Sequence, residues 1–182
     1  MTALKHKLIQ YLATKKNNSN SAFTLVELIV VVVIIGILSS IAIPSFQNAS
    51  DKAKQKEPAT LLASYVKAAQ AYFTEYSMNA RSSQDLGQYI SVTGCRNNNP
   101  SYCKTNTAYD YTNRSSTSWF APSGYFQVYM QQSGTRTLFR ALPTGQYSNA
   151  GYGVSACYNS STGATKVVER TSKGRGVPNI NC

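Results

Sequence analysis

One carboxylate stands near the start of a long apolar run. Glu27 is the only charged residue between Phe23 and Ile43. As a helix this run would be roughly 30 Å long, about the thickness of the hydrocarbon core of a bilayer. A carboxylate costs about 2.5–3.5 kcal/mol at the centre of a membrane, and less toward its edge. We therefore expect a partner charge to compensate Glu27.

The segment before the apolar run is basic. It contains no acidic residue, and its lysines are Lys5, Lys7, Lys15 and Lys16. Because positive charge favours the cytoplasmic side, this end is predicted to stay in the cytoplasm. A simple secretory signal, cut at small residues such as Ser39-Ser40-Ile41-Ala42 and lost with its apolar run, is the alternative.

The residues around Glu27 resemble the class III signal of type IV prepilins. The resemblance covers Ala22-Phe23-Thr24-Leu25-Val26-Glu27, and in that family a prepilin peptidase cuts just before an aromatic or other apolar residue. It implies that residues 1–22 are a cytoplasmic leader that is removed, and that the new amino group of Phe23 is N-methylated. The family usually has glycine before the cut, so Ala22 is a departure, although we still expect cleavage there.

The same resemblance implies assembly roles for Glu27, Gly36 and Pro44. Glu27 corresponds to the family acid, and an amine one helical turn away in low dielectric can pair with it, within a subunit or across to a neighbour. A buried unpaired charge costs several kcal/mol, so a subunit would dock where its Glu27 meets the next amino terminus. Gly36 and Pro44 correspond to the family's glycine and proline, where the first helix can loosen. The alternative is that Glu27 merely extends to the membrane interface.

Helical periodicity continues past the apolar run. Apolar residues recur at helical spacing over residues 61–76, which is typical of one buried stripe. We therefore predict one helix from about residue 24 to about residue 77, with bends or local opening at Pro44 and Pro58. Pro58 could instead begin a second helix.

Short β-prone runs follow the helix. Two hairpins are predicted, over residues 125–142 and 152–170. A sheet of roughly four antiparallel strands could rest its apolar face on the helix stripe. Trp119-Phe120 is a weak further strand candidate, and residues 79–118 are predicted to form a long surface loop with little regular structure. The predicted fold is α+β, similar to that of the type IV pilins.

The cysteine pattern predicts disulfides. The chain contains Cys95, Cys103, Cys157 and Cys182, without the tight paired spacing of a zinc site. An even number of cysteines in a chain delivered outside the cytoplasm indicates two bridges, for which three pairings are possible. We favour Cys95–Cys103, a short loop, and Cys157–Cys182, which would resemble the disulfide-bounded C-terminal loop of the family.

Composition bounds the function. The formal net charge of +11 could favour anionic polymers such as DNA, polysaccharide or lipid headgroups, or serve solubility alone. The lysines at 52, 54 and 56 would suit lipid headgroups. Tyr102, Tyr109 and Tyr111 could present stacking surfaces for bases or sugars, with packing as the commoner role. No close carboxylate pair, phosphate-binding glycine loop or metal-ligand cluster is evident, so we expect no enzymatic activity, no cofactor and no metal.

The resemblance thus implies a structural subunit of a type IV pilus. The expected parts are a leader (1–22), a membrane and filament-core helix (23–52) and a globular head (53–182). The precursor would lie in the inner membrane and then join a homo-oligomeric helical filament on the cell surface, with prepilin peptidase and the pilus assembly machinery as partners. Residues 68–75 lean toward the G/H-like major pilins of cyanobacteria. A minor pilin, a type II secretion pseudopilin and a DNA-binding tip pilin are the alternatives.

Overall fold

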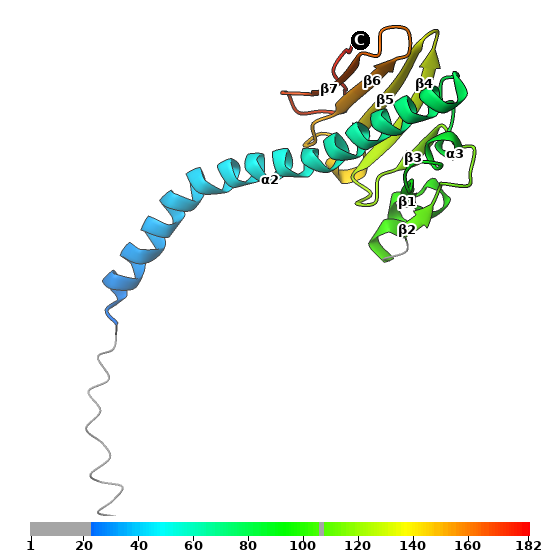
Figure 1. Cartoon of the computed structure of the whole chain (residues 1–182). Coiled ribbons are helices and arrows are strands. Elements are labelled where there is room, and N and C mark those ends of the chain that lie inside the picture. Colours follow the sequence, from blue (N-terminus) through cyan, green and yellow to red (C-terminus); the bar gives the residue numbers. More distant parts are fainter. Residues whose placement is uncertain (1–22, 106–107) are drawn as a thin grey trace, which may run out of the picture. The chain divides into compact units, whose positions relative to one another are not determined.

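A computed structural model describes residues 23–105 and 108–182 (Figure 1). The predicted leader, residues 1–22, lies outside the described residues, and so does Ala22 at the predicted cleavage site. Contacts divide the chain into two compact units, one that ends at Ser45 and one that spans Phe46–Cys182.

The first element, α2, is one uninterrupted helix, Leu25–Tyr76. It differs from the predicted helix by one residue at each end. Pro44 and Pro58 both lie inside it, and each removes only one backbone donor from a helix of 52 residues. The alternative in which Pro58 begins a second helix is therefore wrong.

The N-terminal half of α2 is apolar and uncovered. An 18-residue window there has a mean hydropathy of 2.9, and none of it is buried within the protein. By length and composition this segment can cross a membrane. Its exposed side chains include Ile34, Ile37 and Leu38. An apolar surface of this extent is typical of a segment that contacts lipid or another apolar protein surface.

The second half of α2 lies across one face of an antiparallel sheet (Figure 1). Leu62, Tyr65 and Ala69 are almost completely buried there, in one core with Trp119 and Phe139 of the sheet. This contact confirms the predicted packing of the helix stripe on the sheet. The packing buries apolar surface, which is the dominant favourable term in folding.

The sheet has five strands rather than the predicted four. In spatial order they are β3 (Ser118–Phe120), β4 (Phe126–Ser133), β5 (Arg136–Pro143), β6 (Val154–Asn159) and β7 (Thr165–Glu169). Both predicted hairpins are present as antiparallel pairs, β4 with β5 and β6 with β7. The fifth strand forms because Trp119, which is fully buried, anchors this short edge segment on the core.

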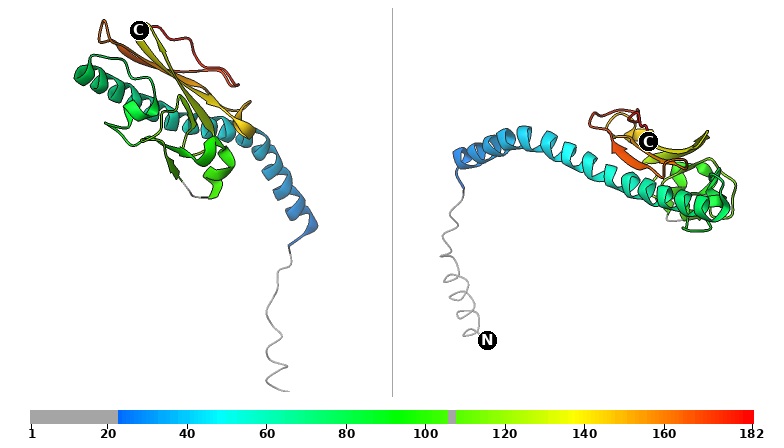
Figure 2. Two further views of the ribbon diagram at one scale, coloured as in Figure 1. Left: turned by 90° about the vertical axis from the view of Figure 1, so that its right-hand side faces the viewer. Right: turned by 45° about the horizontal axis from the view of Figure 1, so that its top comes forward.

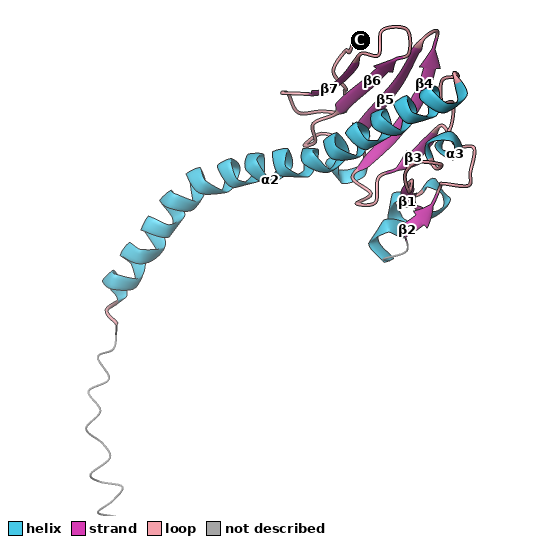
Figure 3. Cartoon of the chain, viewed as in Figure 1, coloured by secondary structure: helices cyan, strands magenta, loops and turns pink. Residues whose placement is uncertain are grey.

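Residues 79–118 are more regular than predicted, as Figure 3 shows. They contain α3 (Ser83–Leu86), β1 (Thr93–Cys95), the 3-10 helices η1 (Arg96–Asn98) and η2 (Pro100–Thr105), and β2 (Ala108–Asp110). The prediction of a loop with little regular structure is therefore wrong. Strands β1 and β2 pair antiparallel, and Val92 and Tyr111 are buried in the same hydrophobic core as Leu62 and Trp119, so this polar segment packs onto the main core.

The C-terminal segment covers the second face of β6. All six residues of β6 are buried, although strand side chains alternate between two faces. On the face away from α2, Ser155 Oγ donates to the carbonyl of Pro178 at 2.7 Å, and Cys157 is bonded to Cys182. The segment after β7 thus returns beside the sheet (Figure 2).

Candidate functional site

Thr24 and Glu27 form a reciprocal cap at the start of α2. The amide and the hydroxyl of Thr24 both donate to Glu27 Oε2, at 2.8 and 2.9 Å. The amide of Glu27 donates to Thr24 Oγ1 at 3.2 Å. This is a capping box, which satisfies backbone donors that the helix itself leaves unpaired. The spelling Thr-x-x-Glu before an apolar run is the sequence signal for it.

The cap fixes the Glu27 carboxylate close to the predicted new amino terminus. Phe23, the first described residue, is 88% exposed and precedes Thr24 directly. Both hydrogen bonds from Thr24 go to Oε2, so Oε1 has no protein partner among residues 23–105 and 108–182. One carboxylate oxygen is therefore oriented while the other is available to a cation.

Gly36 and Pro44 lie farther along the same helix. A rise of about 1.5 Å per residue separates Gly36 from Glu27 by roughly 13 Å, so the structure does not gather the three predicted assembly residues into one site. A Cβ placed on Gly36 would meet no atom within 4 Å apart from its chain neighbours and the nearby backbone of its own helix. Tertiary packing among the described residues therefore gives no reason for glycine at position 36.

The two disulfides join Cys95 to Cys103 and Cys157 to Cys182. These are the pairs favoured from the sequence. Cys95–Cys103 links β1 to η2, within the segment that was predicted to be a loop. Cys157–Cys182 fixes the last residue of the chain to β6, which keeps the C-terminal segment on the sheet.

Polar contacts also join the C-terminal segment to α2. Asp51, which is buried, pairs with Lys173 at 2.9 Å, and Lys56 pairs with Glu169 at 2.8 Å. Between them, Gln55 Nε2 donates to the carbonyl of Arg170 at 3.0 Å. Sequence reasoning missed these contacts, since their partners lie more than a hundred residues apart.

These ion pairs change the interpretation of the basic cluster at 52, 54 and 56. Lys56 is held by Glu169 at 2.8 Å, and Lys54 lies 3.9 Å from Asp51. Lys54 also lies over the rings of Tyr125 and Tyr147, at 5.3 and 5.1 Å from their centroids. Two of the three lysines thus have partners in this chain, whereas Lys52 is exposed and has no ion-pair partner among the described residues.

The tyrosines at 109 and 111 have structural partners. Tyr111 is buried, its hydroxyl donates to the carbonyl of Cys95 at 2.8 Å, and its ring meets that of Tyr109 edge to face. Tyr109 is half-buried and lies under the guanidinium of Arg114. Over the described ranges, no group of three or more His, Cys, Asp or Glu residues is arranged to hold a metal ion.

Comparison with known proteins finds one family model and similar curated proteins. The prokaryotic N-terminal methylation motif matches residues 17–43, the segment that contains Ala22, Phe23 and the cap. The chain is 39% identical over 71 residues to the type IV major pilin protein PilA of Myxococcus xanthus (strain DK1622), across 39% of this chain and 32% of that protein. It is 34% identical over 94 residues to the fimbrial protein of Neisseria meningitidis serogroup B (strain ATCC BAA-335 / MC58), across 44% of this chain and 53% of that protein.

The chain therefore spans about a third of one of these relatives and about half of the other. No solved structure matches it significantly. Neither relative is cyanobacterial, and the lean toward G/H-like pilins stays a prediction. In its methylation motif, at the start of a long apolar helix, and in the packing of that helix on an antiparallel sheet, the chain is similar to the type IV pilins.

Proposed function

We propose that this chain is a structural subunit of a type IV pilus. Its precursor is cut between Ala22 and Phe23, methylated at the Phe23 amino group and assembled helically into an extracellular filament. The observation that carries the proposal is the Thr24–Glu27 cap, which orients a carboxylate at the start of an uncovered apolar helix. Two similar proteins named as a major pilin and a fimbrial protein support it.

The apolar half of α2 supports both stages of this life cycle. No part of residues 23–105 and 108–182 covers it, so it needs the inner membrane before assembly and other copies of the same helix afterwards. Residues 23–52 then serve as membrane and filament-core helix, and residues 53–182 as the head. A homo-oligomeric filament, prepilin peptidase and the pilus assembly machinery are the partners of such a subunit.

Charge pairing gives the assembly its register. In a membrane or a filament core, the Glu27 carboxylate is costly unless a cation meets it. Cleavage before Phe23 supplies one, since it creates an amino group that stays basic after methylation. With Oε2 occupied by Thr24, Oε1 can accept the amino terminus of the same or the adjacent subunit. The role is structural rather than enzymatic.

Substitution of Glu27 in the producing cell tests this mechanism. Glu27→Ala removes both charge and cap, whereas Glu27→Gln keeps an oxygen that can accept from Thr24 but carries no charge. Both variants should be inserted and cleaved, and both should fall at least about tenfold in sheared filaments, because each leaves the amino terminus unpaired. Glu75→Gln, at the other end of α2, is the matched control. Normal incorporation of Glu27→Ala would refute charge pairing, and a defect in Glu27→Ala alone would assign the effect to the cap.

A further inference from the structure

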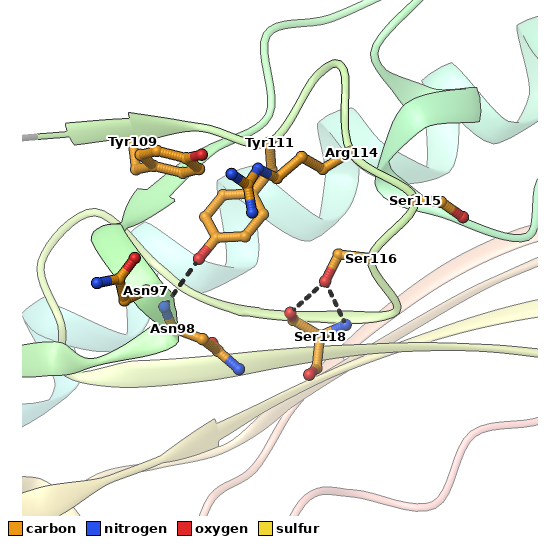
Figure 4. Close-up of a pocket in the computed structure, with 8 residues that line it drawn as sticks. All are labelled: Asn97, Asn98, Tyr109, Tyr111, Arg114, Ser115, Ser116 and Ser118. Carbon is orange, nitrogen blue, oxygen red and sulfur yellow. Dashed lines mark hydrogen bonds between the residues drawn. The ribbon is translucent and has the colours of Figure 1, made fainter.

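A cavity of about 570 Å³ opens beside β1 and β2 (Figure 4). It is formed by η1, the end of β2 and the loop that leads into β3. Its lining residues are Asn97, Asn98, Tyr109, Tyr111, Arg114, Ser115, Ser116 and Ser118. Every one of these side chains carries a polar group, and the volume lies in the range of small-molecule sites.

Arg114 places an uncompensated positive charge at this cavity. Its guanidinium lies 4.8 Å from the centroid of the Tyr109 ring, and the Tyr109 ring in turn packs edge to face on Tyr111. In the described part of the chain, the ion pairs involve Lys54, Lys56 and Lys173 only, so Arg114 has no carboxylate partner. A guanidinium held over an aromatic ring is preorganised to bind a carboxylate through two parallel hydrogen bonds.

Two asparagines complete the opposite wall in a backbone conformation that L-residues rarely adopt. Asn97 and Asn98 have φ of 54° and 52°, and such residues persist only where the surrounding structure fixes them. Here the backbone N–H of Asn98 donates to the Tyr111 hydroxyl at 3.1 Å, and the Cys95–Cys103 disulfide closes the loop. Among the residues drawn in Figure 4, no hydrogen bond engages the side-chain amide of either asparagine.

Together these groups match the chemistry of an acidic sugar. Amides supply both donors and acceptors, which suit sugar hydroxyl groups, and the guanidinium suits a carboxylate. We propose that this cavity binds an acidic saccharide, with its carboxylate on Arg114 and its hydroxyl groups on Asn97, Asn98 and the neighbouring serines. Tyr109 acts as a positioning residue, because it fixes the guanidinium.

A nucleic acid fits this cavity less well. Strands of DNA or RNA are bound through several cations that follow the backbone, whereas the lining contains the single cation Arg114. Three lysines of the head are already paired with acids. The proposal goes beyond filament formation, and the cavity can bind a saccharide whether or not the chain assembles.

Titration of the full chain in detergent micelles tests the proposal. The probe is trigalacturonic acid, with uncharged galactotriose and a short oligothymidylate as comparisons, and calorimetry gives each Kd. We expect only the acidic trisaccharide to bind, with Arg114→Gln weakening it at least about tenfold, as loss of a hydrogen bond to a charged group does. Arg140→Gln, an exposed arginine on β5, should bind like the unsubstituted chain.

A second variant separates binding from folding. Asn97→Gly suits the positive φ and removes the amide, so it should fold at least as well and still bind severalfold more weakly. Equal affinity of Arg114→Gln and the unsubstituted chain would overturn the proposal. So would equal binding of galactotriose, tighter binding of the oligothymidylate, or no binding of the acidic trisaccharide.

Discussion

The hydroxyl of Thr24 and the carboxylate of Glu27 cap the same helix end reciprocally. Thr24 donates twice to Glu27 Oε2 and accepts from the Glu27 amide. The bonds are local and involve only groups that follow the proposed cut, so they can persist after the leader is removed. Thr24 thereby restricts the rotamers of the side chain that is proposed to meet the next amino terminus.

Loss of the Thr24 hydroxyl should impair assembly without affecting insertion. Thr24→Val keeps the shape of the side chain and the backbone amide that donates to Glu27 Oε2, but it loses the two hydrogen bonds of the hydroxyl, whereas Thr24→Ser keeps the hydroxyl. We expect Thr24→Val to lower the amount of subunit in sheared filaments severalfold, since losing a cap costs about 1 kcal/mol, and Thr24→Ser to restore it. Equal filament yield from both variants would show that the cap does not position Glu27.

The two disulfides should stabilise the head unequally. Cys157–Cys182 spans 25 residues and Cys95–Cys103 spans 8, and closing the longer loop removes more entropy from the unfolded chain. Loop entropy gives about 3–4 kcal/mol for the first and about 2–3 kcal/mol for the second. Double alanine variants of each pair, unfolded in urea, should therefore lose stability in that order.

Removal of Cys157–Cys182 should also release the C-terminal segment from β6. Limited proteolysis of that double variant is expected to cleave after residue 170 well before the rest of the head, while the Cys95/Cys103 variant should resist there. If both variants were cleaved after residue 170 at the same rate, the bridge would not be what keeps this segment in place.

Buried tyrosines should make the head sensitive to alkali. Burial raises the pKa of Tyr65 to about 12. In the core, the Tyr65 hydroxyl accepts a hydrogen bond from Trp119 Nε1 at 3.2 Å. The neutral Tyr65 side chain stabilises the folded state. Because an unfolded tyrosine ionises near pH 10, this contribution to the free energy of unfolding is complete below about pH 10. It is lost as the pH rises to about 12, by about 3 kcal/mol at most. Burial and the charge of Asp51 also raise the pKa of Tyr147, which adds to the loss.

The variant Tyr65→Phe measures how much of the alkaline loss of stability is due to Tyr65. The variant should be less stable at neutral pH, because the Trp119 N–H loses its acceptor, and its free energy of unfolding should fall less steeply between pH 10 and 12. Tyr129→Phe, on an exposed side chain of β4, should leave the slope unchanged. An identical alkaline slope for Tyr65→Phe would show that Tyr65 ionises equally in both states.

Periodic segments of the sequence predicted the fold well. The long helix and both hairpins follow from regular spacing of apolar residues, and the structure confirms them. The same reasoning failed for residues 79–118, because their packing onto the main core depends on isolated residues such as Val92 and Tyr111 that no local pattern connects. The edge strand β3 is only three residues long, too short to show an alternation.

Only the local contacts of the candidate site can be predicted from the sequence. Thr24 and Glu27 lie three residues apart, and the spelling Thr-x-x-Glu could have predicted the cap, although the prediction made for Glu27 was charge pairing alone. The pairing of Asp51 with Lys173 and the assembly of Asn97, Tyr109 and Arg114 around one cavity depend on tertiary folding. Composition indicated a basic, tyrosine-rich chain but could not say which cations lack a partner.

Mass spectrometry of filaments sheared from cells tests the central claim most directly, since it reads both abundance and the N-terminal peptide. A dominant chain that begins at methylated Phe23 is the predicted result, and it would establish a processed major subunit of the pilus. A processed chain that stays in the membrane and is absent from the sheared fraction would contradict that claim and indicate a minor or secretion pseudopilin. A chain cut after Ala42 and secreted without its apolar helix would contradict the whole account.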